Sequence, residues 1–225
     1  MQRHAIPVKL IPLFMSLAVA SAYAQNAPVS AVSADNASAV FNYDYKDIQL
    51  RSTAPPAPVG SSLLMNAAAA RNCGVDAEFK IAATENLRIN GGLEYLAASY
   101  TSFPGGSCSL ARPIAGLVLC GVQTVPFDLS GFALINAPKL SYVLGFAYAI
   151  DVPYGTLSLA ANDFYKSSYA FSSDGTPSQK AYHLTSASLI WRTPDERYDV
   201  QVYGKNLGGT YYYPTALGPA GGSYV

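Results

Sequence analysis

The run from Lys139 to Ile150 alternates large apolar side chains with smaller ones, and this pattern restricts the fold more than any other feature of the chain. The alternate positions are Leu140, Tyr142, Leu144, Phe146, Tyr148 and Ile150. Successive side chains of a β-strand point to opposite faces, so these residues predict a strand with one continuous apolar face. The run Tyr198–Leu207 repeats the pattern, because Val200 and Val202 fall on one face while Asp199 and Gln201 fall on the other.

Alternation of this kind predicts seven strands, at residues 39–46, 68–82, 87–100, 139–150, 156–171, 181–192 and 198–207. Tight turns at 84–86, 152–155 and 193–197 are separated by longer connections rich in Pro, Gly and Ser. Bacterial membrane barrels have short periplasmic turns and long outer loops. We expect the apolar face of each strand to touch lipid, including Phe41, Tyr43 and Tyr45 in the first strand.

The predicted fold class is therefore all-β, an antiparallel up-and-down transmembrane β-barrel wall of about seven strands. The smallest bacterial barrels have about eight strands, so this wall is expected to be an incomplete, open barrel.

The N-terminus has the features of a secretory leader. Basic residues precede an apolar run, and Ala22-Tyr23-Ala24 matches the small-x-small pattern of a cleavage site. We expect cleavage between Ala24 and Gln25. The apolar run is shorter than the roughly 20 residues that a spanning helix needs. The predicted organisation is a signal peptide at 1–24, a disordered spacer at 25–38 and a barrel portion at 39–225.

The charge content argues against a nucleic-acid partner. The chain has 14 basic and 14 acidic residues, and only 12% of its residues are charged, against 50% hydrophobic. Loss of the leader removes two basic residues and no acidic one, so the remaining chain is slightly acidic. Nucleic-acid binding needs a basic surplus gathered on one face.

The cysteines leave one pairing open. Cys108 and Cys120 lie in the long connection 101–137, which strand parity places outside the cell. Exported chains can keep disulfides, so these two either form a bridge or stay free. Cys73 is interpreted as a small apolar residue on a membrane-facing strand. No metal or cofactor is expected, since the two loop cysteines lack the close spacing of zinc ligands and only His183 follows the leader.

No catalytic site is expected. Ser186 and Ser188 lie on a different face from His183, so the sequence assembles no serine nucleophile with its base. We interpret His183 as a polar wall position near the outer rim. Asp163 interrupts the apolar face of its strand, at a cost of up to a few kcal/mol near the bilayer midplane, so a bulge or a position near the rim is expected.

The candidate functional residues are binding surfaces. Alternation places a polar set in the wet interior of the barrel: Asp76, Glu78, Lys80, Arg88, Asn90 and Glu94. Tyr211, Tyr212 and Tyr213 follow the last strand and are expected at the extracellular rim, where ligands arrive. The alternative is that these residues serve only the wall, because polar interiors and aromatic girdles are general in such barrels.

Several motifs resemble those of TonB-dependent receptors, the active importers of the Gram-negative outer membrane. Val202-Tyr-Gly-Lys-Asn-Leu207, followed by two tyrosines, resembles the family's GxNL…xYY signature. Tyr43-Asp-Tyr-Lys-Asp-Ile-Gln49 resembles a strand motif of the family, and the segment 66–78 resembles another, with Asp76 in place of the usual Glu. Leu134-Ile-Asn-Ala-Pro138 resembles the segment that precedes a family strand.

The resemblance covers about residues 40–213. It implies an outer-membrane location, contact with lipid, and uptake of a siderophore or another large nutrient in partnership with TonB. The family barrel has about 22 strands around a plugged lumen. Residues 25–38 are too few to hold that plug, so we expect a fragment that does not transport alone. A small porin-like barrel and a secreted β-sandwich binding module are the alternatives, and a sandwich would bury one face of its strands.

Overall fold

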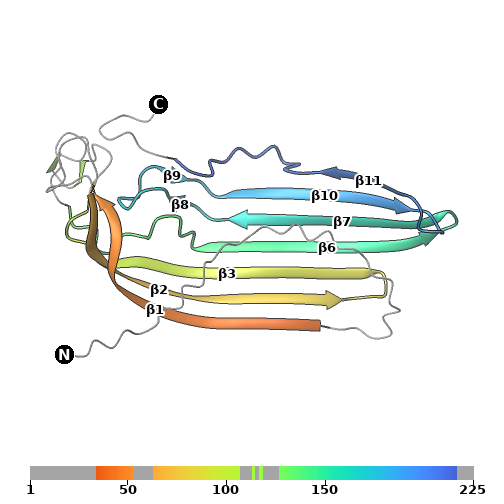
Figure 1. Ribbon diagram of the computed structural model, residues 1–225, viewed down its shortest axis with the longest axis horizontal. Coiled ribbons are helices and arrows are strands. Elements are labelled where there is room, and N and C mark those ends of the chain that lie inside the picture. Colours follow the sequence, from red (N-terminus) through yellow and green to blue (C-terminus); the bar gives the residue numbers. More distant parts are fainter. Residues whose placement is uncertain (1–33, 53–62, 107–112, 115–116, 119–126, 217–225) are drawn as a thin grey trace.

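A computed structural model describes residues 34–52, 63–106, 113–114, 117–118 and 127–216. Its main feature is one seven-stranded sheet in which strands that follow one another in the chain pair antiparallel (Figure 1). The strands, in sheet order, are β1 (Ala34–Ser52), β2 (Leu63–Ala82), β3 (Leu87–Ser102), β6 (Leu140–Val152), β7 (Gly155–Lys166), β10 (Tyr182–Arg192) and β11 (Asp199–Gly204). The predicted all-β, up-and-down, open sheet of seven strands is confirmed.

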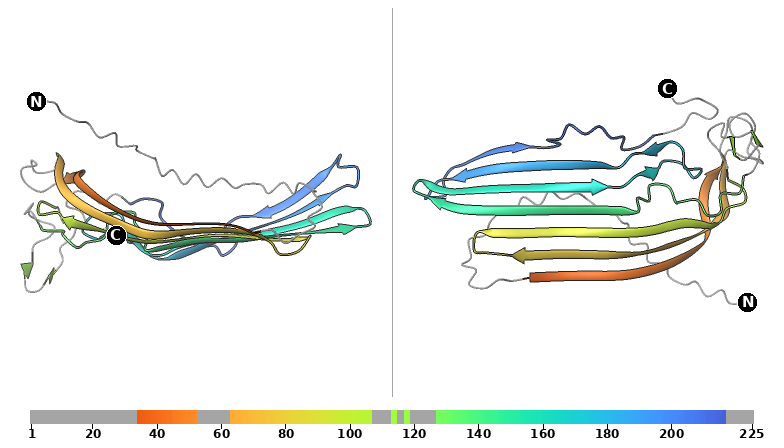
Figure 2. Two further views of the ribbon diagram at one scale, coloured as in Figure 1. Left: turned by 90° about the horizontal axis from the view of Figure 1, so that it is seen from below. Right: turned by 180° about the vertical axis from the view of Figure 1, so that it is seen from behind.

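Seen from its edge, the sheet is a single layer that curves along its length (Figure 2). A sandwich requires two sheets packed face to face. The described strands form one large sheet and two hairpins of two residues per strand, which argues against the sandwich alternative. No helix among the described residues is long and apolar enough to cross a membrane.

Tight turns lie together at one end of the sheet, as the sequence predicted (Figure 1). The β2–β3 turn is closed by the Thr84 hydroxyl, which accepts a hydrogen bond from the Leu87 amide at 2.9 Å. Gly155 opens β7 immediately after the β6–β7 turn. Its φ of +131° lies outside the range that other residues adopt, and a Cβ there would lie 1.8 Å from the Arg192 carbonyl oxygen. Glycine is therefore required at this position.

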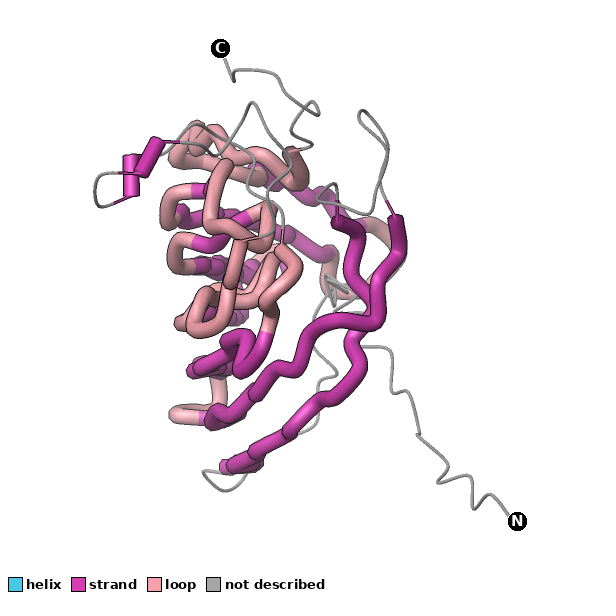
Figure 3. The backbone as a smooth tube through the Cα atoms, turned by 90° about the vertical axis from the view of Figure 1, so that its left-hand side faces the viewer, coloured by secondary structure: helices cyan, strands magenta, loops and turns pink. Residues whose placement is uncertain are grey.

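The longer connections lie at the opposite end, which faces the viewer in Figure 3. They contain two small hairpins, β4 (Pro113–Ile114) with β5 (Leu117–Val118) and β8 (Tyr169–Ala170) with β9 (Ser178–Gln179). The predicted fifth strand, 156–171, is too long. β7 ends at Lys166, and the chain then turns into the β8–β9 hairpin, where the Phe171 amide donates to the Pro177 carbonyl at 2.9 Å.

A small hydrophobic core lies at this loop end. Its members are buried to 3% exposure or less: Ala68, Ala70, Tyr100, Phe103 and Leu129. The segment after β3 folds back on the sheet, because the Leu129 amide donates to the Phe103 carbonyl at 2.9 Å and the Gly131 amide donates to the Tyr100 carbonyl at 2.8 Å. The Ser130 hydroxyl donates to Asp128 at 2.5 Å. This bond holds the pKa of the Asp128 carboxyl below its ordinary value.

β1 differs from the prediction. It begins at Ala34, so the end of the predicted spacer 25–38 belongs to the strand, while residues 25–33 lie outside the described part. The register pairs Phe41 with Gly74 and Tyr43 with Asn72. Paired residues share a face, so the aromatic side of β1 lies with the polar side of β2 and not with its apolar side.

The prediction failed because the face that a strand presents depends on its register with the neighbouring strand. Alternation within one strand does not determine that register. A slip of one residue exchanges the two faces of a strand. The Phe41 ring lies over Gly74, whose added Cβ would meet that ring at 2.7 Å. Aromatic rings continue along this face, with centroids 5.7 Å apart for Phe41 and Tyr43 and 6.3 Å apart for Tyr43 and Tyr45.

Candidate functional site

From β2 to β11, one face of the sheet is apolar. Tyr148, Leu159, Leu189 and Val202 pair in succession across β6, β7, β10 and β11, and all four are exposed. Soluble monomers rarely expose a continuous apolar area of this width. The outer wall of a membrane barrel requires one, because its apolar band faces lipid. The predicted apolar faces of the strands after β1 therefore form one surface.

The opposite face carries the predicted interior residues. Asp76 pairs with Glu94, and Lys80 pairs with Asn90. Glu78 shares their side of β2, and Arg88 shares the side of Asn90 and Glu94 on β3, as their spacing along each strand requires. The structure thus brings the predicted interior set onto one face. Their contact with a ligand stays a prediction.

The register that pairs Asp76 with Glu94 continues across the sheet to a cation, Lys166. Glu94 pairs with Ser141, which pairs with Lys166 at the end of β7. The Lys166 ammonium lies 5.4 Å from the centre of the Tyr169 ring and 5.7 Å from that of Phe164, within reach of cation–π attraction. Sequence reasoning missed Lys166, because Ser141 lies on another strand and Tyr169 in the β8–β9 hairpin.

A shallow hollow at the β1–β2 pair has a volume of about 120 Å³ and is lined by Ala37, Ser38, Ala39, Asp76 and Glu78. Pockets for drug-sized ligands measure about 300–1,000 Å³. This hollow alone is too small for a large nutrient. Groups of His, Cys, Asp and Glu suited to holding a metal ion are absent from the described residues.

The three predicted rim tyrosines lie beside the outer hairpin. Tyr212 stacks on Tyr182 with ring centres 4.8 Å apart, and the Tyr213 amide donates to the Gln179 side chain at 2.8 Å. Tyr211 is 97% exposed and points into solvent. Two of the three tyrosines thus fasten the chain to the loop end of the sheet, and their position at an extracellular rim stays a prediction.

The GxNL motif owes its shape to Asn206. This residue has φ of +51°, and its side chain makes two hydrogen bonds of 3.0 Å, one to the amide and one to the carbonyl of Thr210. β11 consequently ends at Gly204, before the predicted end at Leu207. The bend returns the chain toward Tyr182, so the motif positions the rim tyrosines.

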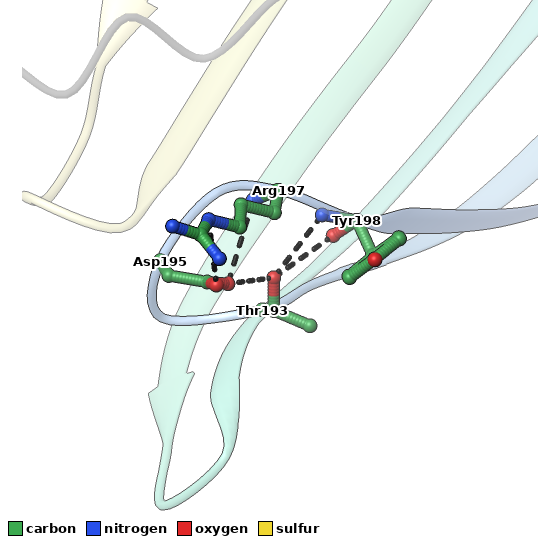
Figure 4. A network of polar contacts seen from close by, with 4 residues as sticks. All are labelled: Thr193, Asp195, Arg197 and Tyr198. Atoms are coloured by element: carbon green, nitrogen blue, oxygen red, sulfur yellow. Dashed lines mark hydrogen bonds and ion pairs between the residues drawn. The ribbon is translucent and has the colours of Figure 1, made fainter.

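The β10–β11 turn is held by Thr193, as Figure 4 shows. Its hydroxyl donates to Asp195 at 2.6 Å and accepts from the Tyr198 amide at 3.2 Å. The bond from Thr193 lowers the pKa of the Asp195 carboxyl below its ordinary value. The Arg197 guanidinium lies 3.5 Å from the same carboxylate, and this exposed ion pair adds little stability.

Four predicted site residues lie outside the described part of the chain: Ala24, Gln25, Cys108 and Cys120. The leader cleavage and the disulfide therefore stay predictions. Cys73 is described, partly buried and a free thiol. It lies on the apolar side of β2 with Val75, as predicted.

The sequence singled out Asp163 and His183 separately, and the structure brings them together. The His183 Nδ1 atom lies 2.9 Å from the Asp163 carboxylate across the β7–β10 pair. The register between these strands is continuous, so the predicted bulge is not needed. Sequence reasoning did not predict this contact, because each residue was noticed only within its own strand and nothing in the sequence gives the register between β7 and β10.

Comparison with known proteins identifies the architecture. The model of the family described as TonB dependent receptor-like, beta-barrel matches residues 36–207. The chain belongs to this family. Curated protein sequences gave no match.

Solved structures agree with this TonB-dependent receptor fold. The ferric yersiniabactin uptake receptor FyuA from Yersinia pestis is similar with a TM-score of 0.60 at 20% identity, over 80% of this chain and 23% of that one. The siderophore receptor PiuA from Acinetobacter baumannii is similar with a TM-score of 0.60 at 17% identity, over 83% of this chain and 23% of that one. The chain thus spans about a quarter of the length of these receptors.

Proposed function

We propose that this chain forms part of the outer-membrane wall of a TonB-dependent receptor that imports a siderophore or another large nutrient. The observation that supports the proposal best is the two-faced sheet. Tyr148, Leu159, Leu189 and Val202 run across four strands on one face, while Asp76 and its neighbours lie on the other. A lipid-facing band opposite a wet interior is the arrangement that a membrane barrel needs.

The location proposed is the outer membrane, reached through export and cleavage of the leader between Ala24 and Gln25. The tight turns then lie in the periplasm and the long connections outside. This orientation places Tyr211 and the β8–β9 hairpin where a ligand in the medium arrives first.

The chain is proposed to need further wall strands before it transports. An open sheet in lipid leaves unpaired backbone groups along its edges, each costing several kcal/mol. The hollow lined by Asp76 and Glu78 is also much smaller than the pockets that hold drug-sized ligands. Ligand and TonB would therefore be engaged by a complete receptor, to which this chain contributes interior charges and the rim.

Fractionation of cells that express the chain with its leader tests the proposal. We expect the chain in the outer-membrane fraction, resistant to washing with alkaline carbonate, with residue 25 as its first residue by N-terminal sequencing. Recovery in the soluble periplasmic fraction would contradict the membrane wall.

Uptake is tested separately. Cells that lack their own receptors and express this chain alone should not accumulate a labelled ferric siderophore above the level of cells carrying an empty vector. Energy-dependent accumulation by the chain alone would show that no further strands are needed.

A further inference from the structure

A polar cluster interrupts the apolar face near its loop end. Asp163 pairs with Leu144 on one side and with Thr185 on the other, so its side chain lies on the apolar face of the sheet. His183 lies on the same face, two residues before Thr185 on β10. A carboxylate on a lipid-facing surface is unfavourable unless its charge is compensated.

Both carboxylate oxygens of Asp163 are compensated from β10. The His183 Nδ1 atom lies 2.9 Å from one oxygen, and the Thr185 hydroxyl donates to the other at 2.8 Å. The Asp163 side chain is 30% exposed, whereas that of His183 is 53% exposed. Among the described residues no hydrogen bond to His183 Nε2 is found, and the exposure of the side chain leaves this atom available to a further partner.

Aromatic rings frame this imidazole. The centre of the Tyr165 ring lies 4.7 Å from that of His183, and Tyr142 lies 6.2 Å from it. The two tyrosines stack on each other with centres 5.0 Å apart. Tyrosines on the outer face of a barrel mark the level at which hydrocarbon gives way to lipid headgroups. The cluster lies at the loop end of β7 and β10, and therefore at this boundary in the outer leaflet.

We propose that His183 binds the terminal phosphate monoester of a lipid headgroup through Nε2, with Asp163 holding the imidazole and Thr185 holding the Asp163 carboxylate. A monoester is the fitting ligand because no headgroup alcohol covers its oxygens, whereas a phosphodiester has one more oxygen substituted. A charged imidazole has two N–H donors. Asp163 takes the one on Nδ1, and the one on Nε2 is then free to donate to the phosphate. A hydrogen bond between charged groups is stronger than a neutral one, and it is stronger still where hydrocarbon excludes water. The inference rests on the proposed membrane position of the sheet and adds a specific lipid contact to it.

Reconstitution of the full chain into lipid vesicles tests the contact, at about pH 5.5, where phosphatidic acid, like phosphatidylglycerol, carries close to one negative charge. Three kinds of vesicle are compared: phosphatidylcholine alone, and phosphatidylcholine with equal fractions of phosphatidic acid or of phosphatidylglycerol. The last two have similar surface charge, but only phosphatidic acid presents a phosphate monoester. Urea unfolding gives the ratio of folded to unfolded chain in each.

We expect phosphatidic acid to raise this ratio about tenfold over phosphatidylglycerol. His183→Gln should abolish the difference, and Asp163→Asn should reduce it. Ser186→Ala, on the opposite face of the same strand, should leave it unchanged. An equal difference in His183→Gln would overturn the proposal, and so would an equal gain from inorganic phosphate added to phosphatidylcholine vesicles.

Insertion is measured in the same samples by protection from added protease. A chain that inserts but shows no preference for phosphatidic acid refutes the headgroup contact and leaves the proposed function standing. A chain that inserts into none of the vesicles refutes insertion of this chain by itself and with it the headgroup contact, whereas the proposed function is tested by the fractionation of cells described above.

Discussion

Substitution of lysine at Leu159 and at Ala160 tests the two faces of the sheet within one strand. Leu159 lies on the apolar face of β7, paired with Tyr148 and Leu189, and is 42% exposed. Ala160 is the next residue, so its side chain points to the polar face. The two changes introduce the same charge at neighbouring positions, and they differ only in the face that receives it.

The expected magnitudes differ strongly. A lysine on the lipid-facing side near the bilayer midplane costs about 2–4 kcal/mol. Because about 1.4 kcal/mol is a factor of ten, Leu159→Lys should lower the ratio of folded to unfolded chain roughly 30- to 700-fold. Ala160→Lys places its ammonium on the wet face, where substitutions away from special contacts cost about 0.5 kcal/mol or less.

The assay is urea unfolding in vesicles, together with the amount of each variant that reaches the outer membrane of cells in a protease-protected form. Leu159→Lys should be depleted from the protected fraction and Ala160→Lys should not. Equal losses for the two variants would refute the assignment of faces, and a larger loss for Ala160→Lys would reverse it.

Three further changes test local features. Gly155→Ala should destabilise the sheet by about 1–3 kcal/mol, because φ is positive there and the methyl group meets backbone, and urea unfolding measures this loss. Thr193→Val should raise the pKa of Asp195 toward its ordinary value in an NMR titration. A lowered pKa stabilises the fold above the unfolded value of about 3.9, and this gain is lost as the pH falls below it. The stability difference between the variant and the unaltered chain should therefore be larger above about pH 4 than in acid, where only the loss of the bond from the Tyr198 amide remains. Tyr212→Ala should make the segment after β11 more sensitive to protease by losing a stacking contact of about 0.5–1.5 kcal/mol, whereas Tyr211→Ala, at a fully exposed ring, should not.

The number of strands and most of their faces could be predicted from sequence because alternation is a local property. Leu140–Ile150 and Tyr198–Val202 each show their two faces without reference to any neighbour. The tight turns were also predictable, since Thr84 and Gly155 are residues with strong turn preferences. The family motifs added the order of these segments along the chain.

The orientation of β1 was not predictable in this way. Phe41, Tyr43 and Tyr45 alternate as clearly as the residues of any other strand, yet they lie on the polar side of the sheet. Which side an alternating face occupies depends on register, and here the register places Phe41 over Gly74, a residue on another strand. The register between β7 and β10 was likewise not predictable, so the contact between Asp163 and His183 was not predicted although each residue was noticed.

The loop end was the least predictable part. Residues 101–137 have no period, so the fold of their described parts depends on tertiary contacts that no local pattern encodes. Phe103 and Leu129 become buried only because the segment folds back onto β2 and β3. The charges predicted for the interior could be identified from sequence as a set sharing one face, but the placement of Lys166 close to the rings of Phe164 and Tyr169 could not.

The odd number of strands in the sheet limits what can lie beside it. Directions alternate across seven strands, so β1 and β11 point the same way. Two copies of this sheet inserted in the same sense would meet β11 to β1 as a parallel seam, unlike every other junction in the wall. An all-antiparallel ring that includes this sheet must therefore contain an odd number of additional strands, beginning and ending with strands that run toward the end of the sheet where the tight turns lie.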